Sequence, residues 1–140
     1  MRFFPVHKSC IIIIAILFLT FCGCSGNSQL KGKVTFNDGE PVPCGTVVFS
    51  TETFEARGEI KPDGSYTVSS RGKNDGLPKG VYSVSLTGVV KFERNAPMAF
   101  PVSLCDEKYS APETSGLQCT VPAPGNRFDI ILDPHPGNYP

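Results

Sequence analysis

Short segments in which apolar and polar residues alternate are the feature that most constrains the fold of this chain. The clearest is Val81–Thr87 (VYSVSLT), where Tyr82, Val84 and Leu86 alternate with mostly polar neighbours. A period of two places these three side chains on one face of a β-strand. Leu30–Phe36 has the same period, with lysines on the opposite face. Both segments therefore predict strands that are buried on one side only.

Further strand-like segments follow, and none has the period of a long amphipathic helix. We expect additional strands over residues 45–50, 57–60, 66–69, 117–121 and 128–132. Turn signals separate several of them, such as Pro62–Ser65 (PDGS), after which the strand at 66–69 is expected to form a hairpin with its predecessor. A long excursion, Gly88–Arg127, precedes the last strand. The pattern predicts a small all-β sandwich of about seven strands.

The amino-terminal segment has the pattern of an export signal. Arg2 and Lys8 precede an apolar run, Cys10–Cys22, which ends at Gly23-Cys24. A basic start, a short apolar stretch and a small residue at the exit are typical of such signals. The run is shorter than the roughly 20 residues of a membrane-spanning helix. We therefore expect a signal helix that is removed from the mature protein.

Gly23-Cys24 resembles the lipobox of bacterial lipoproteins, although Phe21 stands where Leu, Val or Ile is usual. The resemblance implies a signal peptide over residues 1–23 and a lipidated Cys24 at the mature amino terminus. Cys22 fits less well, because bulky Phe21 precedes it. The expected address is the cell membrane or outer membrane, with the lipid as membrane partner. Cleavage without a lipid and an uncleaved anchor are the alternatives.

The rest of the chain divides into a tether at 24–29, one domain at 30–133 and a Pro-rich tail at 134–140. The whole chain has 13 basic and 13 acidic residues, and the predicted signal removes two basic ones, Arg2 and Lys8, which leaves a net charge of −2. A domain so close to neutral lacks the basic surface of a nucleic-acid-binding protein. We therefore expect no nucleic-acid partner.

Scarce histidine and the cysteine spacing limit the chemistry that the domain can perform. His7 lies in the predicted signal and His135 in the tail, so the domain lacks the commonest general base and metal ligand. We expect no enzymatic activity, cofactor or metal. Cys44, Cys105 and Cys119 have no metal-binding spacing. A Cys105–Cys119 disulfide is one expectation, and three small buried hydrophobic side chains are the other.

The order of the strand and turn motifs extends over the mature chain. The motifs are GKVT at 32–35, DGEPVP at 38–43, TVVF at 46–49, DGSYTV at 63–68 and LPKGVYSV at 77–84. Their order resembles the carboxypeptidase regulatory-like domain, a prealbumin-like (transthyretin-like) or Ig-like β-sandwich. KYSAPETSGL at 108–117 and NRFD at 126–129 are similar to a group of small bacterial lipoproteins with this domain. The resemblance implies a fold and an address but neither a reaction nor a ligand.

Function in such a domain is expected in the long excursion, because loops on a rigid sandwich commonly carry binding residues. Phe92, Phe100 and Tyr109 are the candidate contact surface, and packing into the core is the alternative for each. The expected role is structural or accessory, with an envelope protein as partner. The alternative is a module that binds a peptide, by adding a strand to a sheet edge, or a glycan.

A covalent cross-link is a further hypothesis. The fold resembles collagen-adhesin B-type repeats, which join a first-strand Lys to a last-strand Asn or Asp with the help of an acid. Here the resemblance implies Lys31 or Lys33, with Asn126 or Asp129, and Glu59 as the acid. The alternation of the first strand predicts instead that its lysines face solvent.

Overall fold

The computed structural model describes residues 26–73, 75–92 and 100–137. The chain forms strands and two short 3-10 helices, and the all-β prediction is confirmed. In chain order these are β1 (Lys31–Phe36), β2 (Thr46–Ser50), β3 (Glu55–Glu59), β4 (Ser65–Thr67), β5 (Gly80–Thr87), β6 (Val90–Phe92), β7 (Pro101–Ser103), η1 (Glu107–Ser110), β8 (Leu117–Val121), η2 (Pro124–Asn126) and β9 (Ile130–Leu132).

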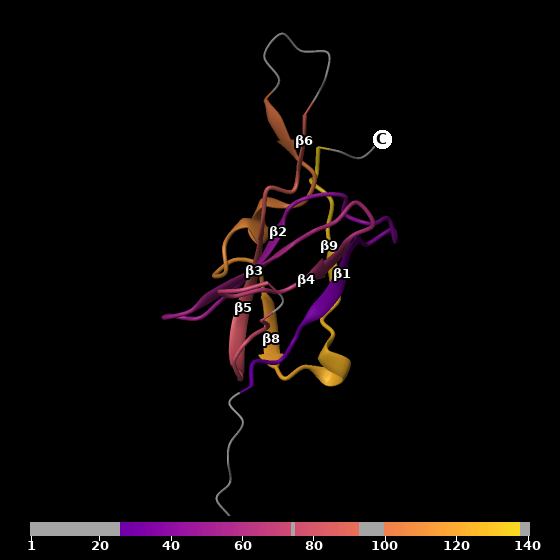
Figure 1. Ribbon diagram of the computed structural model, residues 1–140. Helices are drawn as coiled ribbons and strands as arrows, with labels where there is room; N and C mark the ends of the chain where they lie inside the picture. The colour runs from indigo at the N-terminus through magenta and orange to yellow at the C-terminus, as the bar shows by residue number, and fades with distance from the viewer. Residues whose placement is uncertain (1–25, 74, 93–99, 138–140) are drawn as a thin grey trace, which may run out of the picture.

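Seven of these strands build two facing sheets, β4-β1-β9 and β3-β2-β5-β8. They correspond to the seven strands that the sequence predicted. The first and last strands run parallel, with Val34 beside Ile130, and all other pairs are antiparallel. The remaining pair, β6–β7, is a separate hairpin that projects beyond the sheets (Figure 1). Sequence alternation did not predict this hairpin.

The core lies between the two sheets, where the apolar face of each strand points inward. Phe49 of β2 is fully buried and reaches across to the other sheet. Its ring centroid is 6.2 Å from that of Tyr66 and 6.1 Å from that of Phe128. Tilted and edge-to-face aromatic pairs of this kind add stabilisation beyond the buried area. The period-two pattern of the sequence thus becomes the inner layer of the sandwich.

The strand at 66–69 pairs differently from the prediction. Instead of a hairpin ladder with β3, β4 pairs with β1 in the opposite sheet. Only Ser69 returns to β3, through two backbone hydrogen bonds with Arg57 of 3.0 and 2.8 Å. Gly32 allows the backbone of Phe128 to lie close to β1, since a Cβ on Gly32 would lie 1.8 Å from the carbonyl oxygen of Phe128. The turn therefore carries the chain from one sheet to the other.

Both ends of the domain are bound beyond the boundaries expected from sequence. Ser28, expected in the tether, exchanges backbone hydrogen bonds of 2.8 and 2.9 Å with Leu77. His135, expected in the tail, donates its backbone N–H to the carbonyl of Leu104 at 3.0 Å. Residues 1–25, which include the predicted signal, Cys22 and Cys24, lie outside the described residues.

Candidate functional site

The β6–β7 hairpin carries the most exposed aromatic side chains of the described residues. Phe92 pairs with Pro101 at the outer end of the ladder, and Val90 pairs with Ser103 near the sandwich. Phe92 is 64% exposed and Phe100 is 72% exposed. Exposed aromatic residues that lie together are candidates for contact with a partner. Two of the three predicted contact residues are therefore available on this hairpin.

The base of the hairpin is fixed to the sandwich by close backbone packing. Gly45 has a φ of 118°, and a Cβ on it would lie 2.7 Å from Cγ2 of Val89. The thiol of Cys44 donates to the carbonyl of Val90 at 3.2 Å, and the N–H of Leu104 donates to that of Val89 at 3.0 Å. The hairpin that carries the two exposed rings is thus fixed to the sandwich at its base.

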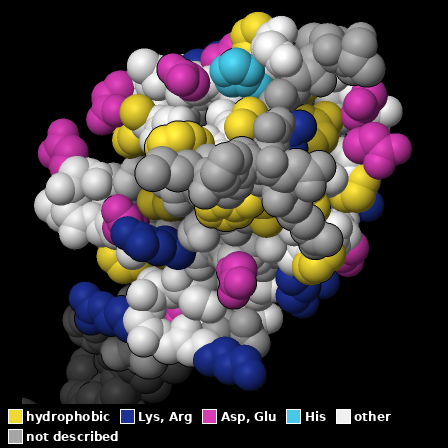
Figure 2. Space-filling model, turned by 90° about the horizontal axis from the view of Figure 1, so that it is seen from above, with side chains coloured by type: hydrophobic (Ala, Val, Ile, Leu, Met, Phe, Trp, Pro, Cys, Tyr) yellow, Lys and Arg dark blue, Asp and Glu magenta, His cyan; other side chains and the backbone are white. Residues whose placement is uncertain are grey.

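The end of the molecule around the hairpin base is partly apolar. Figure 2 shows this end, where hydrophobic side chains gather and acidic side chains lie toward the rim. Val90, Val102 and Leu104 are half-buried there. His135 is joined to this end by the backbone hydrogen bond with Leu104. Its Nδ1 accepts a hydrogen bond from the backbone N–H of Gly137 at 3.1 Å.

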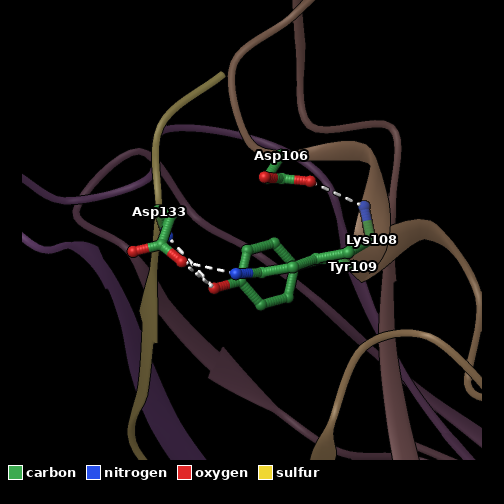
Figure 3. Close-up of polar contacts among 4 residues, drawn as sticks. All are labelled: Asp106, Lys108, Tyr109 and Asp133. Atoms are coloured by element: carbon green, nitrogen blue, oxygen red, sulfur yellow. Dashed lines mark hydrogen bonds and ion pairs between the residues drawn. The ribbon is translucent and has the colours of Figure 1, made fainter. Parts of the chain in front are cut away.

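Tyr109 does not belong to the exposed surface, and its assignment to the contact surface is wrong. Tyr109 is a residue of η1, and its side chain packs into the core, where it is only 5% exposed. Its hydroxyl donates to Oδ2 of Asp133 at 3.0 Å, and the backbone N–H of Asp133 approaches the same hydroxyl at 3.2 Å. Figure 3 shows the ring between η1 and the residue that follows β9. Tyr109 therefore ties the excursion to the sandwich.

Lys108 and Asp133 form an ion pair beside the Tyr109 ring, with Nζ 2.6 Å from Oδ2 (Figure 3). The hydrogen bond with Asp133 raises the pKa of the Lys108 ammonium, and the bond from Lys108 lowers the pKa of the Asp133 carboxyl. Both groups are therefore held in their charged forms at neutral pH. The pair therefore binds η1 to the residue that follows β9.

The rest of the KYSAPETSGL segment is also bonded to the fold. Thr114 donates its hydroxyl to the carbonyl of Lys108 at 2.6 Å. The buried hydroxyl of Ser115 donates to the carbonyl of Val84 in β5, and it accepts from the N–H of Leu117 at 3.2 Å. These bonds satisfy backbone groups of η1, of β5 and of the first residue of β8. The motif that carries the lipoprotein resemblance thus has a structural role in this chain.

The three described cysteines are free thiols, and the predicted Cys105–Cys119 disulfide is not formed. Cys119 pairs with Tyr82 near the start of β5. Cys105 lines a small pocket together with Thr87, which is the last residue of β5. Five residues of strand span about 16 Å, and a disulfide needs Cα atoms about 4.4–6.8 Å apart. Burial raises the pKa of both thiols, which keeps them protonated.

The groups of the cross-link hypothesis are not assembled for an amide bond. Lys31 and Lys33 are exposed. The carboxylate of Asp129 instead pairs with Arg127 at 2.7 Å and accepts the backbone N–H of Lys33 at 2.8 Å. The hydrogen bond from Arg127 lowers the pKa of Asp129 and favours its charged form. The proposed helper Glu59 is exposed in β3 of the opposite sheet.

Comparison with known proteins assigns no family to the chain. No family model matches it, and no curated protein or solved structure matches it significantly. Among the described residues, no group of His, Cys, Asp and Glu is arranged to hold a metal ion. The same part of the chain contains no helix long and apolar enough to cross a membrane. The hairpin is accordingly the best candidate site that the geometry offers.

Proposed function

We propose that this protein is a non-enzymatic, lipid-anchored domain of the cell envelope with a structural or accessory role. We further propose that it belongs with the lipoproteins that carry a carboxypeptidase regulatory-like sandwich, and that the β6–β7 hairpin contacts an envelope protein. The observation that carries the proposal is the placement of the β6–β7 hairpin at the end of the molecule opposite the start of the described chain (Figure 1), with Phe92 and Phe100 exposed.

The length of β5 gives the approximate distance between these two ends. Ser28 pairs with Leu77, shortly before β5 begins, and the hairpin starts shortly after β5 ends at Thr87. The eight residues of β5 extend over about 25 Å. A lipid attached at Cys24, four residues before Ser28, would therefore leave the hairpin on the far side of the domain. This placement suits contact with a partner away from the lipid.

The lipid anchor can be tested by replacing the cysteine that carries it. In Cys24→Ser, we expect the protein to leave the membrane fraction, because a lipoprotein's several acyl chains supply its membrane affinity. Cys22→Ser is the matched control and should remain with the membranes. Membrane retention of Cys24→Ser, measured by fractionation and immunoblotting, would overturn the anchor.

The contact role of the hairpin can be tested by removing its two exposed rings. We expect Phe92→Ser/Phe100→Ser to lose a partner that co-purifies with the wild-type chain from solubilised membranes. Val81 and Ile131 are similarly exposed, at 53% and 66%, but lie on the sheets. The control Val81→Ser/Ile131→Ser should therefore retain the partner. Equal recovery with both double variants would exclude the hairpin as the contact surface.

A glycan-binding role is the second candidate, and the same two rings favour it. Exposed aromatic faces can stack on the apolar face of a sugar ring, so Phe92 and Phe100 would form the platform. Binding on a glycan array that disappears in Phe92→Ser/Phe100→Ser would support this role over a protein partner. An array without hits would favour the protein partner.

A further inference from the structure

The two edges of the four-stranded sheet differ in how they are protected. The outer strands are β3 and β8, each five residues long. An exposed edge strand presents unpaired backbone groups to any chain that can extend the sheet. Proteins commonly block such edges with charged side chains, proline or bulges. Whether β8 is blocked depends on which of its backbone groups face outward.

The hydrogen bonds at the ends of β2 establish that direction. Ile60 donates to Gly45 at 2.9 Å, and Thr51 donates to Phe54 at 2.8 Å, so the odd-numbered residues of β2 bond to β3. In an antiparallel ladder the bonded side alternates from residue to residue. The even-numbered residues of β2 therefore face β5.

The same alternation extends across β5 to the edge strand. Residues 83, 85 and 87 of β5 lie opposite the even-numbered residues of β2 and bond to them. Tyr82 and its even-numbered neighbours consequently bond to Cys119 and the other odd-numbered residues of β8. The N–H and C=O groups of Gln118 and Thr120 are left pointing away from the sheet.

The outward groups of β8 are accessible. Gln118 and Thr120 are exposed, and the only described contact to their backbones is a long one, 3.9 Å from the Cys119 sulfur to the Thr120 oxygen. A Cβ added to Gly116, just before β8, would meet no atom within 4 Å. The described part of the chain thus leaves this edge uncovered.

Charge distinguishes β8 from the edge at β3. Glu55, Arg57 and Glu59 point outward from β3 and are exposed. The outward backbone groups of Arg57 already bond to Ser69, at 3.0 and 2.8 Å. If two copies of β3 paired about their centre, Arg57 would also oppose Arg57 and Glu55 would oppose Glu59, which is unfavourable. The sequence of β8, LQCTV, contains no charge and no proline. Pairing of two β8 strands meets no such repulsion.

We propose that β8 is a self-association edge, which pairs antiparallel with β8 of a second copy of this chain about a two-fold axis at Cys119. Within the five residues of β8, this register uses the outward groups of both residues, because it sets Gln118 opposite Thr120 of the second copy and Thr120 opposite Gln118 of the second copy. The two such pairs form four backbone hydrogen bonds. The four-stranded sheets of both copies then join into one sheet of eight strands.

The contact between two five-residue strands is small beside a standard protein interface of about 1,600 Å². The dimer should accordingly be weak and depend on concentration. Full-length protein in detergent is the material for the test, with the molar mass of the protein component measured by light scattering over a concentration series. We expect a shift from monomer to dimer over roughly the micromolar to millimolar range.

A pair of charge variants tests both the edge and the register. Gln118→Lys/Thr120→Lys places lysine opposite lysine in both pairs and should raise the dissociation constant at least about tenfold. Gln118→Lys/Thr120→Glu places opposite charges there and should preserve the dimer. Both variants change the same two exposed positions, so circular dichroism and thermal unfolding should show equal folding.

Two results would overturn the proposal. One is a wild-type chain that stays monomeric across the whole concentration range. The other is a dimer that the two charge variants affect equally, because pairing at β8 in this register must separate them. Thr120→Pro is an independent variant, since the N–H of Thr120 faces away from β5, and it should also weaken the dimer. Arg57→Ala, on the opposite edge, should leave association unchanged.

Discussion

The chain between β5 and β9 contains two aromatic segments, one exposed and one buried. On the β6–β7 hairpin, Phe92 and Phe100 are 64% and 72% exposed, whereas Tyr109 in η1 is 5% exposed. The hairpin bonds mainly to itself beyond Val90. Tyr109 reaches Asp133, which directly follows β9. The two segments are both aromatic, and they differ in that only Tyr109 has a hydrogen bond to the residue that follows a sheet strand.

The polar contacts around η1 extend this difference to the backbone. Thr114 and Ser115 hold carbonyl groups of η1 and β5. Such bonds matter because a buried polar group without a partner costs about 1–3 kcal/mol. Beyond its base, the hairpin has no comparable described contact with the two sheets. Substitutions in the η1 segment should therefore reduce stability, and substitutions on the hairpin should affect contact with partners.

The largest effect should come from removing the Tyr109 ring. Tyr109→Ala leaves a cavity under η1 and removes the hydroxyl contacts with Asp133. We expect the free energy of unfolding to fall by about 3–5 kcal/mol, as measured by urea titration monitored by circular dichroism. A loss below about 1 kcal/mol would show that the ring does not hold η1 on the sandwich.

A smaller loss should follow from removing the Ser115 hydroxyl. In Ser115→Ala the carbonyl of Val84 and the N–H of Leu117 lose their shared partner. We expect the free energy of unfolding to decrease by about 1–3 kcal/mol. Ser110 is exposed at the end of η1, and Ser110→Ala should stay within about 0.5 kcal/mol of wild type. Equal effects of the two substitutions would contradict a specific role for Ser115.

The Lys108–Asp133 pair should appear in the pH dependence of stability. The pKa of Asp133 is lowered in the folded state, mainly by its hydrogen bond with Lys108. Its contribution is therefore complete above the unfolded pKa of about 3.9 and is lost as pH falls through the lower folded value.

Asp133→Asn provides the reference for that measurement. The stability difference between wild type and Asp133→Asn should be constant near neutral pH and should shrink below about pH 4. Urea titrations over a pH series measure it, and Asp38→Asn, at an exposed turn, is the control. A difference that persists unchanged at low pH would mean that ionisation of Asp133 does not contribute.

The sandwich could be predicted from sequence because most of its strands bury one face, and β2 is apolar on both. Alternation in Val81–Thr87 and Leu30–Phe36 reports which side chains point inward. The strand at 45–50 was predicted instead from its β-branched and aromatic residues. The pattern does not report pairing, so β4 was assigned to β3 although it bonds to β1. Gly32 was a missed signal for the approach of the Phe128 backbone to β1, because a residue without Cβ in a strand often marks close backbone approach.

The site was harder to predict, because the hairpin has no buried face and hence no alternation. β6 and β7 have three residues each, and β7 starts with Pro101. Phe92, Phe100 and Tyr109 were equal candidates for the contact surface, with core packing as the alternative, and sequence did not separate them. Tyr109 was misassigned because its partner Asp133 lies 24 residues away in sequence. Long-range hydrogen bonds of this kind leave no local pattern.

The smallest effect on stability should come from the hairpin itself. Phe92 and Phe100 are mostly exposed, so Phe92→Ala and Phe100→Ala remove little buried surface. Each should change the free energy of unfolding by less than about 0.5 kcal/mol, in the same urea titration that is used for Tyr109→Ala. A loss above about 2 kcal/mol in either variant would show that the ring packs against other parts of the chain. In that case the hairpin would belong to the fold in the same way as η1, and the difference between the two segments would disappear.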